Sequence, residues 1–403
     1  MKKLRLGMFI LLVLTLAISL VAIGCPAEEE EAPPKELKIG AIAGLSGPGS
    51  EALSRGGDGI NAAADWINDK GGLTISGEKY LIKIIMEDCM MSVEGMVAAA
   101  NKLVYDHQVK FIVGGVGVPP FKAAIESVIQ PNKVLRIDTT GQGSEMDLNP
   151  DTPYTFVTTI DTAIHDPALD WLVETHPEVK KLALVCPEDP GVIVVMQNVR
   201  KEAEPRGLTV VSEEYYPFGT ADFYPMWTKV LTAEPDVVVS GAGFPEWFGS
   251  MVKQGRELGF EGPMLFLTQG ADPYVVRDIA GEYATDIFAT SFAFKSPEMT
   301  PVIKEMVEIT PDKFGREATF DDLASWEATW CLVQAIEGAQ SLDPTVVKDY
   351  FEKMESIETP CGTGKMGGLE TFGLNHAVAR SWPLCSIMNG VVEHLMWFPT
   401  ETP

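Results

Sequence analysis

Motifs that carry out covalent chemistry are nearly absent from this chain. The segment Gly44-Leu45-Ser46-Gly47-Pro48 approaches a hydrolase nucleophile motif but lacks its final glycine. The run Gly114-Gly115-Val116-Gly117 could open a dinucleotide site, but Pro120 stands where the third glycine belongs and no acidic partner for a ribose follows. Zinc-protease, paired-cysteine and phosphate-loop motifs do not occur. We therefore expect a protein that is not an enzyme and that uses no cofactor.

The same glycines suit binding without chemistry, because they let the backbone approach a ligand closely. Backbone N–H groups at the start of a helix attract anions, and ligands of open parallel sheets lie at the carboxyl ends of the strands. Several segments follow expected strands in this way and together predict a site for one small molecule: Leu45–Ser46, Gly115–Pro119, Thr139–Gln142, Cys186–Pro190, Gly243–Glu246 and Thr268–Asp272.

Composition excludes several partners. The chain has 403 residues, of which 46% are hydrophobic and 22% are charged, as in a globular protein of two lobes. Its 31 Lys and Arg residues face 57 Asp and Glu residues, a net charge of −26. That balance argues against nucleic acid, whose phosphates require dense positive charge. Five histidines and six scattered cysteines leave little material for a metal site, so we expect none.

The amino-terminal residues indicate export. Lys2, Lys3 and Arg5 precede an uncharged stretch over 7–24, which is typical of a signal peptide and long enough for a membrane anchor as the alternative. Ala22-Ile23-Gly24-Cys25 resembles the bacterial lipobox, which predicts a lipid on Cys25. Without residues 1–24 the charge would be −29, and the acidic, proline-rich stretch 26–36 suits a tether. We expect a lipoprotein in the periplasm or at the outer face of the cytoplasmic membrane.

Strands and helices alternate along the rest of the chain, which predicts an α/β fold of doubly wound parallel sheets in two lobes. Strands are expected at 37–42, 80–87, 110–114, 134–138, 181–186, 208–215, 236–240 and 263–268. Helices are expected at 60–67, 93–105, 120–130, 165–175, 192–206, 223–232, 245–258, 318–340 and 344–354. The tail over 359–395 is strand-like, and Asn389-Gly390 indicates a hairpin turn.

The chain resembles the branched-chain amino-acid (leucine/isoleucine/valine) solute-binding proteins of ABC transporters, which are periplasmic binding proteins of type I. The resemblance spans about 37–392 and lies in Ser46-Gly47-Pro48, Ile67–Gly72, Ala100–Leu103, Phe111–Gly114, Ala221–Phe223, Glu234–Val238 and Gln254–Gly259. It implies two lobes joined by three hinge strands, closure on a small ligand, and an ABC permease as the membrane partner. The expected division is 1–24 signal peptide, 25–36 lipidated tether, 37–157 plus 288–360 first lobe, and 158–287 plus 361–400 second lobe.

The resemblance also places the ligand site. Loops for a ligand carboxylate fall on Val118 with Pro119 and on Gly141 with Gln142, near Thr139 and Thr140. The remaining positions are Ser46 in the first loop, Ala52 at the cap of the side-chain pocket, Glu188, Asp189 and Pro190 in the second lobe, Phe244 with Glu246, and Gln269 with Gly270. The family carries a glutamate for the ligand ammonium where this chain has the neutral Gln269.

That difference bears on the ligand, because a buried ammonium without a carboxylate costs several kcal/mol. An unmodified α-amino acid would need Glu188, Asp189 or Glu246; otherwise the ligand is a carboxylic acid, an amide or an aromatic acid. An amide-responsive sensor on the same fold is the alternative function, and the export signal favours transport.

The cysteines offer little chemistry. Cys361 and Cys385 could pair in an oxidising compartment, whereas Cys186 and Cys331 are expected as buried thiols. Trp326 and Trp330, one helical turn apart, are expected in the core.

Overall fold

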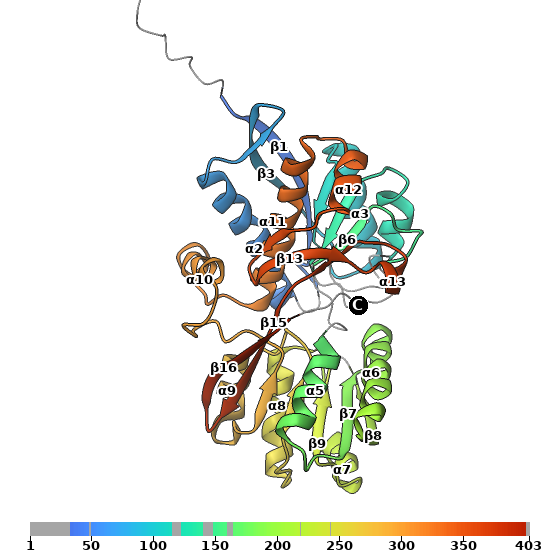
Figure 1. Ribbon diagram of the computed structural model, residues 1–403, viewed down its shortest axis with the longest axis vertical. Coiled ribbons are helices and arrows are strands. Elements are labelled where there is room, and N and C mark those ends of the chain that lie inside the picture. The colour runs from blue at the N-terminus through green and yellow to red at the C-terminus, as the bar shows by residue number, and fades with distance from the viewer. Residues whose placement is uncertain are drawn as a thin grey trace, which may run out of the picture. The chain divides into compact units, whose positions relative to one another are not determined.

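The computed structural model describes residues 33–47, 50–114, 122–139, 148–158, 164–217, 219–241 and 243–399, apart from the side chains of residues 51–53, 190 and 191. Residues 36–403 form one compact unit. Within it the described strands make two sheets, one of nine strands and one of seven (Figure 1). We call each sheet with its covering helices the first and the second lobe.

The first sheet has the order β12-β13-β14-β6-β5-β4-β1-β3-β2. Strands β1, β4, β5, β6 and β14 are parallel to their neighbours in that run, and antiparallel pairs close both edges. The strand bounds are β1 Lys35–Ala43, β2 Leu73–Ile75, β3 Glu78–Asp88, β4 Phe111–Val113, β5 Leu135–Asp138, β6 Thr155–Val157, β12 Ile357–Thr359, β13 Gly362–Gly367 and β14 Ala377–Ala379.

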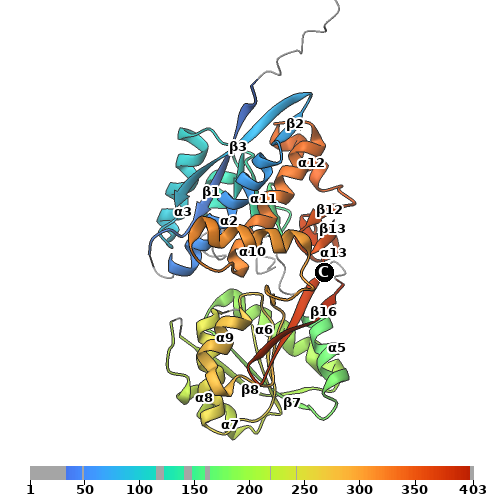
Figure 2. The same ribbon diagram turned by 90° about the vertical axis from the view of Figure 1, so that its left-hand side faces the viewer.

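Successive residues of a strand point to opposite faces of the sheet. Because the strands of the first sheet carry apolar residues on both faces, helices cover both. Ile39 and Ala41 of β1 belong to one apolar cluster, and Ile42 belongs to another. The helices are α2 Ser50–Asp69, α3 Val93–Asn101, α10 Pro301–Phe314, α11 Phe320–Ala339, α12 Pro344–Phe351 and α13 Leu369–Phe372, with π-helical turns at Lys102–Asp106 and Ile125–Ile129. Figure 2 shows α10 beside α2.

Helices α2 and α11 lie unusually close to each other. A Cβ on Gly59 would lie 2.5 Å from the carbonyl oxygen of Asp322, so only glycine fits at this position. Trp66 packs against Trp326 and Trp330, with ring centroids 5.3 and 5.2 Å away. The expectation that Trp326 belongs to the core is thus confirmed, whereas Trp330 is half-buried and packs against the core from its edge.

The second sheet has the order β16-β15-β11-β10-β9-β7-β8, parallel from β8 to β11 and antiparallel at β15 and β16. Its strands are β7 Lys181–Pro187, β8 Thr209–Tyr216, β9 Val237–Ser240, β10 Met264–Phe266, β11 Ile287–Ala289, β15 Trp382–Met388 and β16 Val391–Phe398. Its helices are α5 His165–Thr175, α6 Pro190–Ala203, α7 Tyr224–Thr232, α8 Pro245–Glu257 and α9 Pro273–Ala280, with 3₁₀ turns at Glu204–Arg206 and Gly281–Tyr283. Two apolar clusters again occupy the two faces.

The doubly wound α/β architecture expected from the sequence is confirmed. The hairpin turn is confirmed too: β15 pairs with β16 across Asn389 and Gly390, and both residues have a positive φ, of 50° and 76°. Strands β2, β6, β11 and β12 and helices α9, α10 and α13 were not expected, because they are short or their apolar residues follow neither the helical nor the strand repeat.

The chain passes between the two sheets three times: after β6, after β11 and between β14 and β15. The third passage differs from the expected division, which assigned 361–400 to the second lobe. Strands β13 and β14 instead belong to the first sheet, where β14 pairs with β6 and β13 pairs with β14. The glycine-rich tail gave no sign of where it changes sheet.

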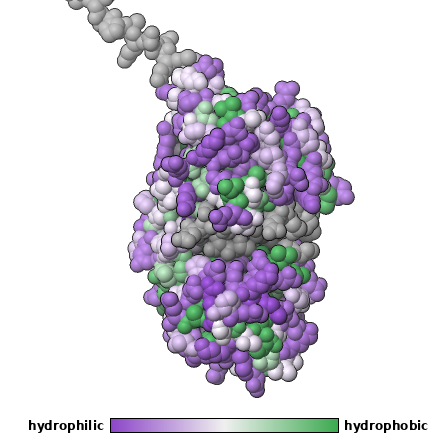
Figure 3. Space-filling model, turned by 45° about the vertical axis from the view of Figure 1, so that its right-hand side comes forward, coloured by the Kyte–Doolittle hydropathy of each residue, from purple (hydrophilic) through white to green (hydrophobic). Residues whose placement is uncertain are grey.

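None of the described helices combines the length and apolar character needed to cross a membrane. The face seen in Figure 3 is mostly hydrophilic, and its hydrophobic residues lie in small separate groups.

Candidate functional site

The expected binding residues follow the parallel strands of both sheets. Thr139 is buried directly after β5, Glu188 follows β7, Phe244 follows β9, and Gln269 with Gly270 follows β10. Other expected positions lie outside the described residues: Cys25, Val118, Pro119, Thr140, Gly141 and Gln142. Ala52 lies in α2 and Pro190 begins α6, but their side chains are not described.

Ser46 belongs to a hydrogen-bonded loop junction. Its hydroxyl donates to Asp88 Oδ2 at 2.5 Å, and the backbone N–H groups of Leu45 and Ser46 donate to Asp88 Oδ1 at 3.0 and 3.2 Å. The Met90 N–H adds a fourth bond of 2.8 Å. Burial acts to raise the pKa of Asp88, but these hydrogen bonds outweigh it and hold the pKa below its ordinary value. Asp88 thus joins the loops after β1 and β3, a role that sequence reasoning missed.

Two of the expected acidic residues of the second lobe differ in role. Asp189 accepts a hydrogen bond of 3.1 Å from the Val192 N–H and so stabilises the first turn of α6. Glu188 is exposed. Asp189 is therefore largely a helix-start residue, while Glu188 is open to solvent.

Phe244 and Glu246 lie at the start of α8. The Phe244 ring meets Trp247 edge to face, with centroids 4.9 Å apart, which holds this half-buried aromatic in place. Glu246 is exposed in the first helical turn. A Cβ on Gly270 would lie 3.0 Å from the Gly243 carbonyl oxygen, so the loops after β9 and β10 approach each other closely.

Gln269 is the most constrained of the expected site residues, with 1% of its surface exposed. Its side-chain oxygen accepts a hydrogen bond of 3.3 Å from Nη2 of Arg380, and its backbone carbonyl accepts one of 2.7 Å from the Ser291 hydroxyl. Arg380 also donates through Nε to Glu327 Oε1 at 2.5 Å, and both of these charged side chains are fully buried. Sequence reasoning missed this pair, although a charged residue inside the apolar stretches around 327 and 380 was a signal.

A group of charges from both lobes surrounds the start of α11. Burial and the neighbouring Asp322 carboxylate raise the pKa of Asp321 to about 7, whereas Arg55 and Arg316 act to lower it, and Glu246 adds a smaller upward effect. Asp272 caps α9 by accepting from the Tyr274 and Val275 N–H groups. Burial also raises the pKa of Asp272.

The cysteines of the described part of the chain are all free and buried. Cys186 and Cys331 are buried thiols as expected, and burial raises the pKa of Cys186 to about 12, which suits no nucleophile. The suggested pairing of Cys361 with Cys385 is wrong. Cys361 lies between β12 and β13 of the first sheet, whereas Cys385 lies in β15 of the second.

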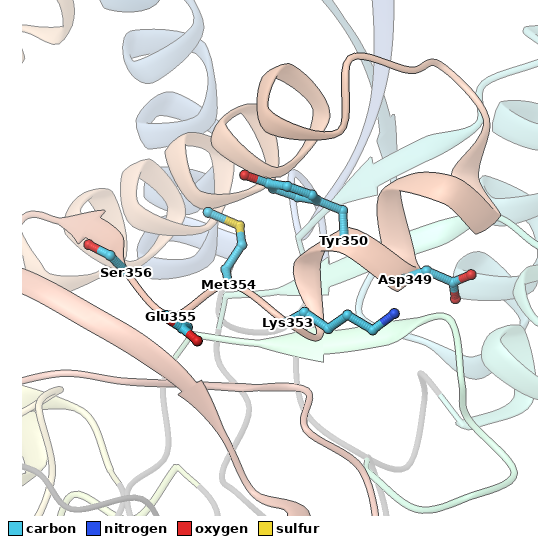
Figure 4. A pocket seen from close by; sticks show the side chains of 6 residues that line it. All are labelled: Asp349, Tyr350, Lys353, Met354, Glu355 and Ser356. Atoms are coloured by element: carbon cyan, nitrogen blue, oxygen red, sulfur yellow. The ribbon is translucent and has the colours of Figure 1, made fainter.

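Two surface pockets lie away from the strand ends. One, of about 630 Å³, is lined by residues from a single stretch around the end of α12, including Tyr350, Lys353 and Met354 (Figure 4). The other, of about 620 Å³, lies between the turn at 148–152, Ile125 and Phe372. Neither contains an expected binding residue. No group of His, Cys, Asp and Glu suited to a metal ion occurs among the described residues.

The amino-acid sequence matches known proteins along nearly the whole length of the chain. A family model described as periplasmic binding protein matches residues 36–384. The Leu/Ile/Val-binding protein of Citrobacter freundii is 24% identical over 335 residues, which cover 81% of this chain and 86% of that protein.

Two solved structures show the same fold. The branched-chain amino acid transporter substrate-binding protein LivJ from Streptococcus pneumoniae, in complex with isoleucine, is 20% identical, covers 92% of this chain and 100% of its own, and has a TM-score of 0.74. An ABC transporter solute-binding protein from R. palustris, in complex with 4-hydroxybenzoate, is 17% identical, covers 91% and 98%, and has a TM-score of 0.75. With two doubly wound lobes and a family match over most of its length, this chain belongs to the periplasmic binding protein family.

Proposed function

We propose that this protein is an extracytoplasmic solute-binding lipoprotein that delivers one small ligand to an ABC permease. The ligand is a carboxylate or an amide: an amino-acid-like compound or an aromatic acid. The strand-end loops of the two lobes bind it, and the three chain passages between the sheets act as the hinge on which the lobes close. Closure is driven by contacts that form only in the closed state.

The neutral Gln269 carries the proposal on ligand class. It is buried and hydrogen-bonded to the cation Arg380 at the position where amino-acid-binding relatives are expected to hold the ligand ammonium. A ligand ammonium at this position would meet no carboxylate on Gln269 and would lose its hydration, which disfavours it. The relatives include proteins solved with isoleucine and with 4-hydroxybenzoate, so both ligand classes are compatible with the fold.

A thermal-shift screen tests the ligand class. Isoleucine, leucine, benzoate, 4-hydroxybenzoate and benzamide are added separately to the mature protein, and the midpoint of unfolding (Tm) is recorded. A ligand present at 100 times its Kd stabilises the folded state by about 2.7 kcal/mol, so a carboxylate or amide should raise Tm. If leucine and isoleucine alone raise Tm, the argument from Gln269 is wrong, and if no compound does, the proposed function is contradicted for these ligand classes.

Anchoring is a separate part of the proposal. Export through residues 1–24 and a lipid on Cys25 predict that the protein partitions with the membrane fraction and incorporates labelled palmitate. Cys25→Ala should release it and abolish the label. Recovery of unlabelled wild-type protein from the cytoplasm would instead favour the sensor alternative.

A further inference from the structure

His376 lies directly before β14 in the first lobe, where it is fully buried. Its ring stacks on the ring of Phe156 in β6, with centroids 3.9 Å apart and planes 16° from parallel. Each ring nitrogen contacts an acceptor: Nδ1 lies 2.8 Å from the Thr155 carbonyl oxygen, and Nε2 lies 2.7 Å from Glu352 Oε1. The His376 carbonyl in turn accepts a bond of 3.0 Å from the Val157 N–H. His376 therefore connects β6 to Glu352, the residue that follows α12.

Two acceptors around one imidazole require two ring protons. A neutral imidazole has a proton on one nitrogen only, whereas the protonated ring donates from both. In the neutral ring, the second nitrogen of His376 would direct a lone pair at an oxygen atom 2.7 or 2.8 Å away, which is repulsive. The geometry thus fits the protonated ring, and loss of one proton must break one of the two contacts.

The charged groups that act on this ring come from α12 and the residue after it. The Glu352 carboxylate favours the protonated ring and the Lys348 ammonium disfavours it, while β6 contributes an uncharged carbonyl and a phenyl ring. Lys348 itself lies between two carboxylates, 2.7 Å from Glu352 Oε1 and 2.8 Å from Asp349 Oδ1. Burial acts to raise the pKa of Glu352, but its bonds to Lys348 and His376 outweigh burial and hold that pKa below its ordinary value. Glu352 is therefore ionised at neutral pH, and the second proton belongs to the ring.

Burial sets the pH range in which the ring takes up that proton. It lowers the pKa of His376 below the ordinary 6.5, against the attraction of Glu352. The ring is therefore neutral at neutral pH and becomes protonated only in more acidic solution. Because the unfolded chain binds this proton more tightly, the contribution of His376 to the free energy of unfolding falls as pH drops through this range.

The contact with Glu352 is the one that opens when the ring is neutral. The Thr155 carbonyl belongs to a fully buried residue, and a buried acceptor that loses its donor pays the full cost of desolvation. The Glu352 side chain is 24% exposed and keeps its ion pair with Lys348, so its carboxylate can turn to water. The remaining ring proton therefore stays on Nδ1, in the bond to Thr155.

We propose that His376 is a proton-operated latch between β6 and the end of α12: the protonated ring holds both Thr155 and Glu352, and the neutral ring releases Glu352. Release acts on the stretch 353–356, which follows directly and lines the surface pocket shown in Figure 4. It also acts next to the hinge of the proposed function, because β6 and β14 each lead into a passage between the sheets. The latch needs no ligand, so its test is independent of solute binding.

Nuclear magnetic resonance of the mature protein, labelled with ¹⁵N in its histidines, tests the latch directly. The chain has five histidines, and the His376 ring signals are assigned by their loss in His376→Gln. Spectra are recorded between about pH 4 and 8, across the range in which histidine titrates. Both ring nitrogens should be protonated at the acidic end, the midpoint should lie below pH 6.5, and above it Nδ1 alone should keep its proton. A ring that stays in one protonation state throughout, or a neutral ring protonated on Nε2, would overturn the proposal.

Glu352→Gln removes the charge that favours the protonated ring. Proton binding to His376 should weaken by about tenfold or more, which lowers the midpoint by at least about one pH unit. The matched control is Glu355→Gln, which removes the same charge from an exposed side chain with no hydrogen bond to His376 in the described structure, and its midpoint should equal that of wild type. Equal midpoints in wild type and Glu352→Gln would refute the latch. This comparison also serves if His376→Gln does not fold, because the ring signal that moves identifies His376.

Hydrogen exchange measures the release of Glu352 itself. The N–H groups of Glu352 and Met354 bond to carbonyls of Lys348 and Phe351 at 3.0 and 3.1 Å. Their protection, corrected for the intrinsic effect of pH, should fall by about threefold or more between pH 5 and pH 8 in wild type, as for one lost hydrogen bond. In Glu352→Gln it should stay constant, because a carboxamide can accept from the protonated ring and donate to the neutral one. Equal protection at both pH values in wild type would contradict the release.

Discussion

Glu327→Gln should destabilise the protein strongly, because it removes the counter-charge of a buried cation. Both side chains of the Glu327–Arg380 pair are fully buried, and Oε2 of Glu327 has no hydrogen-bond partner in the described structure. Burial raises the pKa of Glu327, and Arg380 acts to lower it. Removing one partner of a buried ion pair costs about 3–5 kcal/mol, since the remaining charge is left uncompensated. We expect a loss in that range in the free energy of unfolding.

Urea denaturation followed by tryptophan fluorescence measures this loss. The matched control is Glu36→Gln, which breaks the exposed pair with Lys83, where both side chains are about half exposed. Exposed pairs contribute about 0–1 kcal/mol. The double variant Glu327→Leu with Arg380→Met should be more stable than Glu327→Gln because it leaves no unpaired charge. A cost for Glu327→Gln no larger than that of Glu36→Gln would refute the reasoning.

Three further predictions concern pH, helix packing and the thiols. Asp321 has a pKa of about 7 in the folded protein against 3.8 ordinarily, so the stability that its protonated form contributes is lost as pH rises through 7. Asp321→Asn should therefore raise the free energy of unfolding more at pH 8 than at pH 5, by at most about 3 kcal/mol, and an equal effect at both pH values in urea titrations would contradict this. Gly59→Ala places a Cβ 2.5 Å from the Asp322 carbonyl oxygen and should lower the free energy of unfolding by about 1–3 kcal/mol in the same titration. Asn61→Ala, on the exposed side of α2, is the control and should lower it by less than about 0.5 kcal/mol. Similar losses for the two variants would disprove the close helix contact. The buried thiols of Cys361 and Cys385 should stay unreactive toward a thiol reagent until urea unfolds the protein, and rapid labelling in the folded state would contradict their burial.

The α/β architecture was predictable because the apolar residues of most helices and strands recur with the spacing typical of that element. Strands such as β4, β7 and β9 are short apolar runs followed by turn residues, and helices such as α5 have polar and apolar faces that mark their bounds. The sheet that each late strand joins was not predictable, because β13 and β14 are glycine-rich or very short and pair with strands more than 200 residues earlier in the chain or with each other. Local sequence does not encode such long-range pairing.

The candidate site was predictable only as a set of loops. Strand ends indicated where a ligand could bind, but the partners that fix those loops come from distant residues. Asp88 meets Ser46 across 42 positions, and Arg380 meets Gln269 across 111. The proposed disulfide failed for the same reason, since two cysteines near one another in the sequence lie in different sheets.

Small-angle X-ray scattering on the mature protein tests the central claim most directly. The radius of gyration is measured without ligand and then with saturating benzoate, 4-hydroxybenzoate or isoleucine, each first shown by calorimetry to bind or not to bind. We predict that a compound that binds, and only such a compound, reduces the radius of gyration as the lobes close around it. A bound ligand that leaves the scattering curve unchanged would contradict hinge closure as the mode of binding.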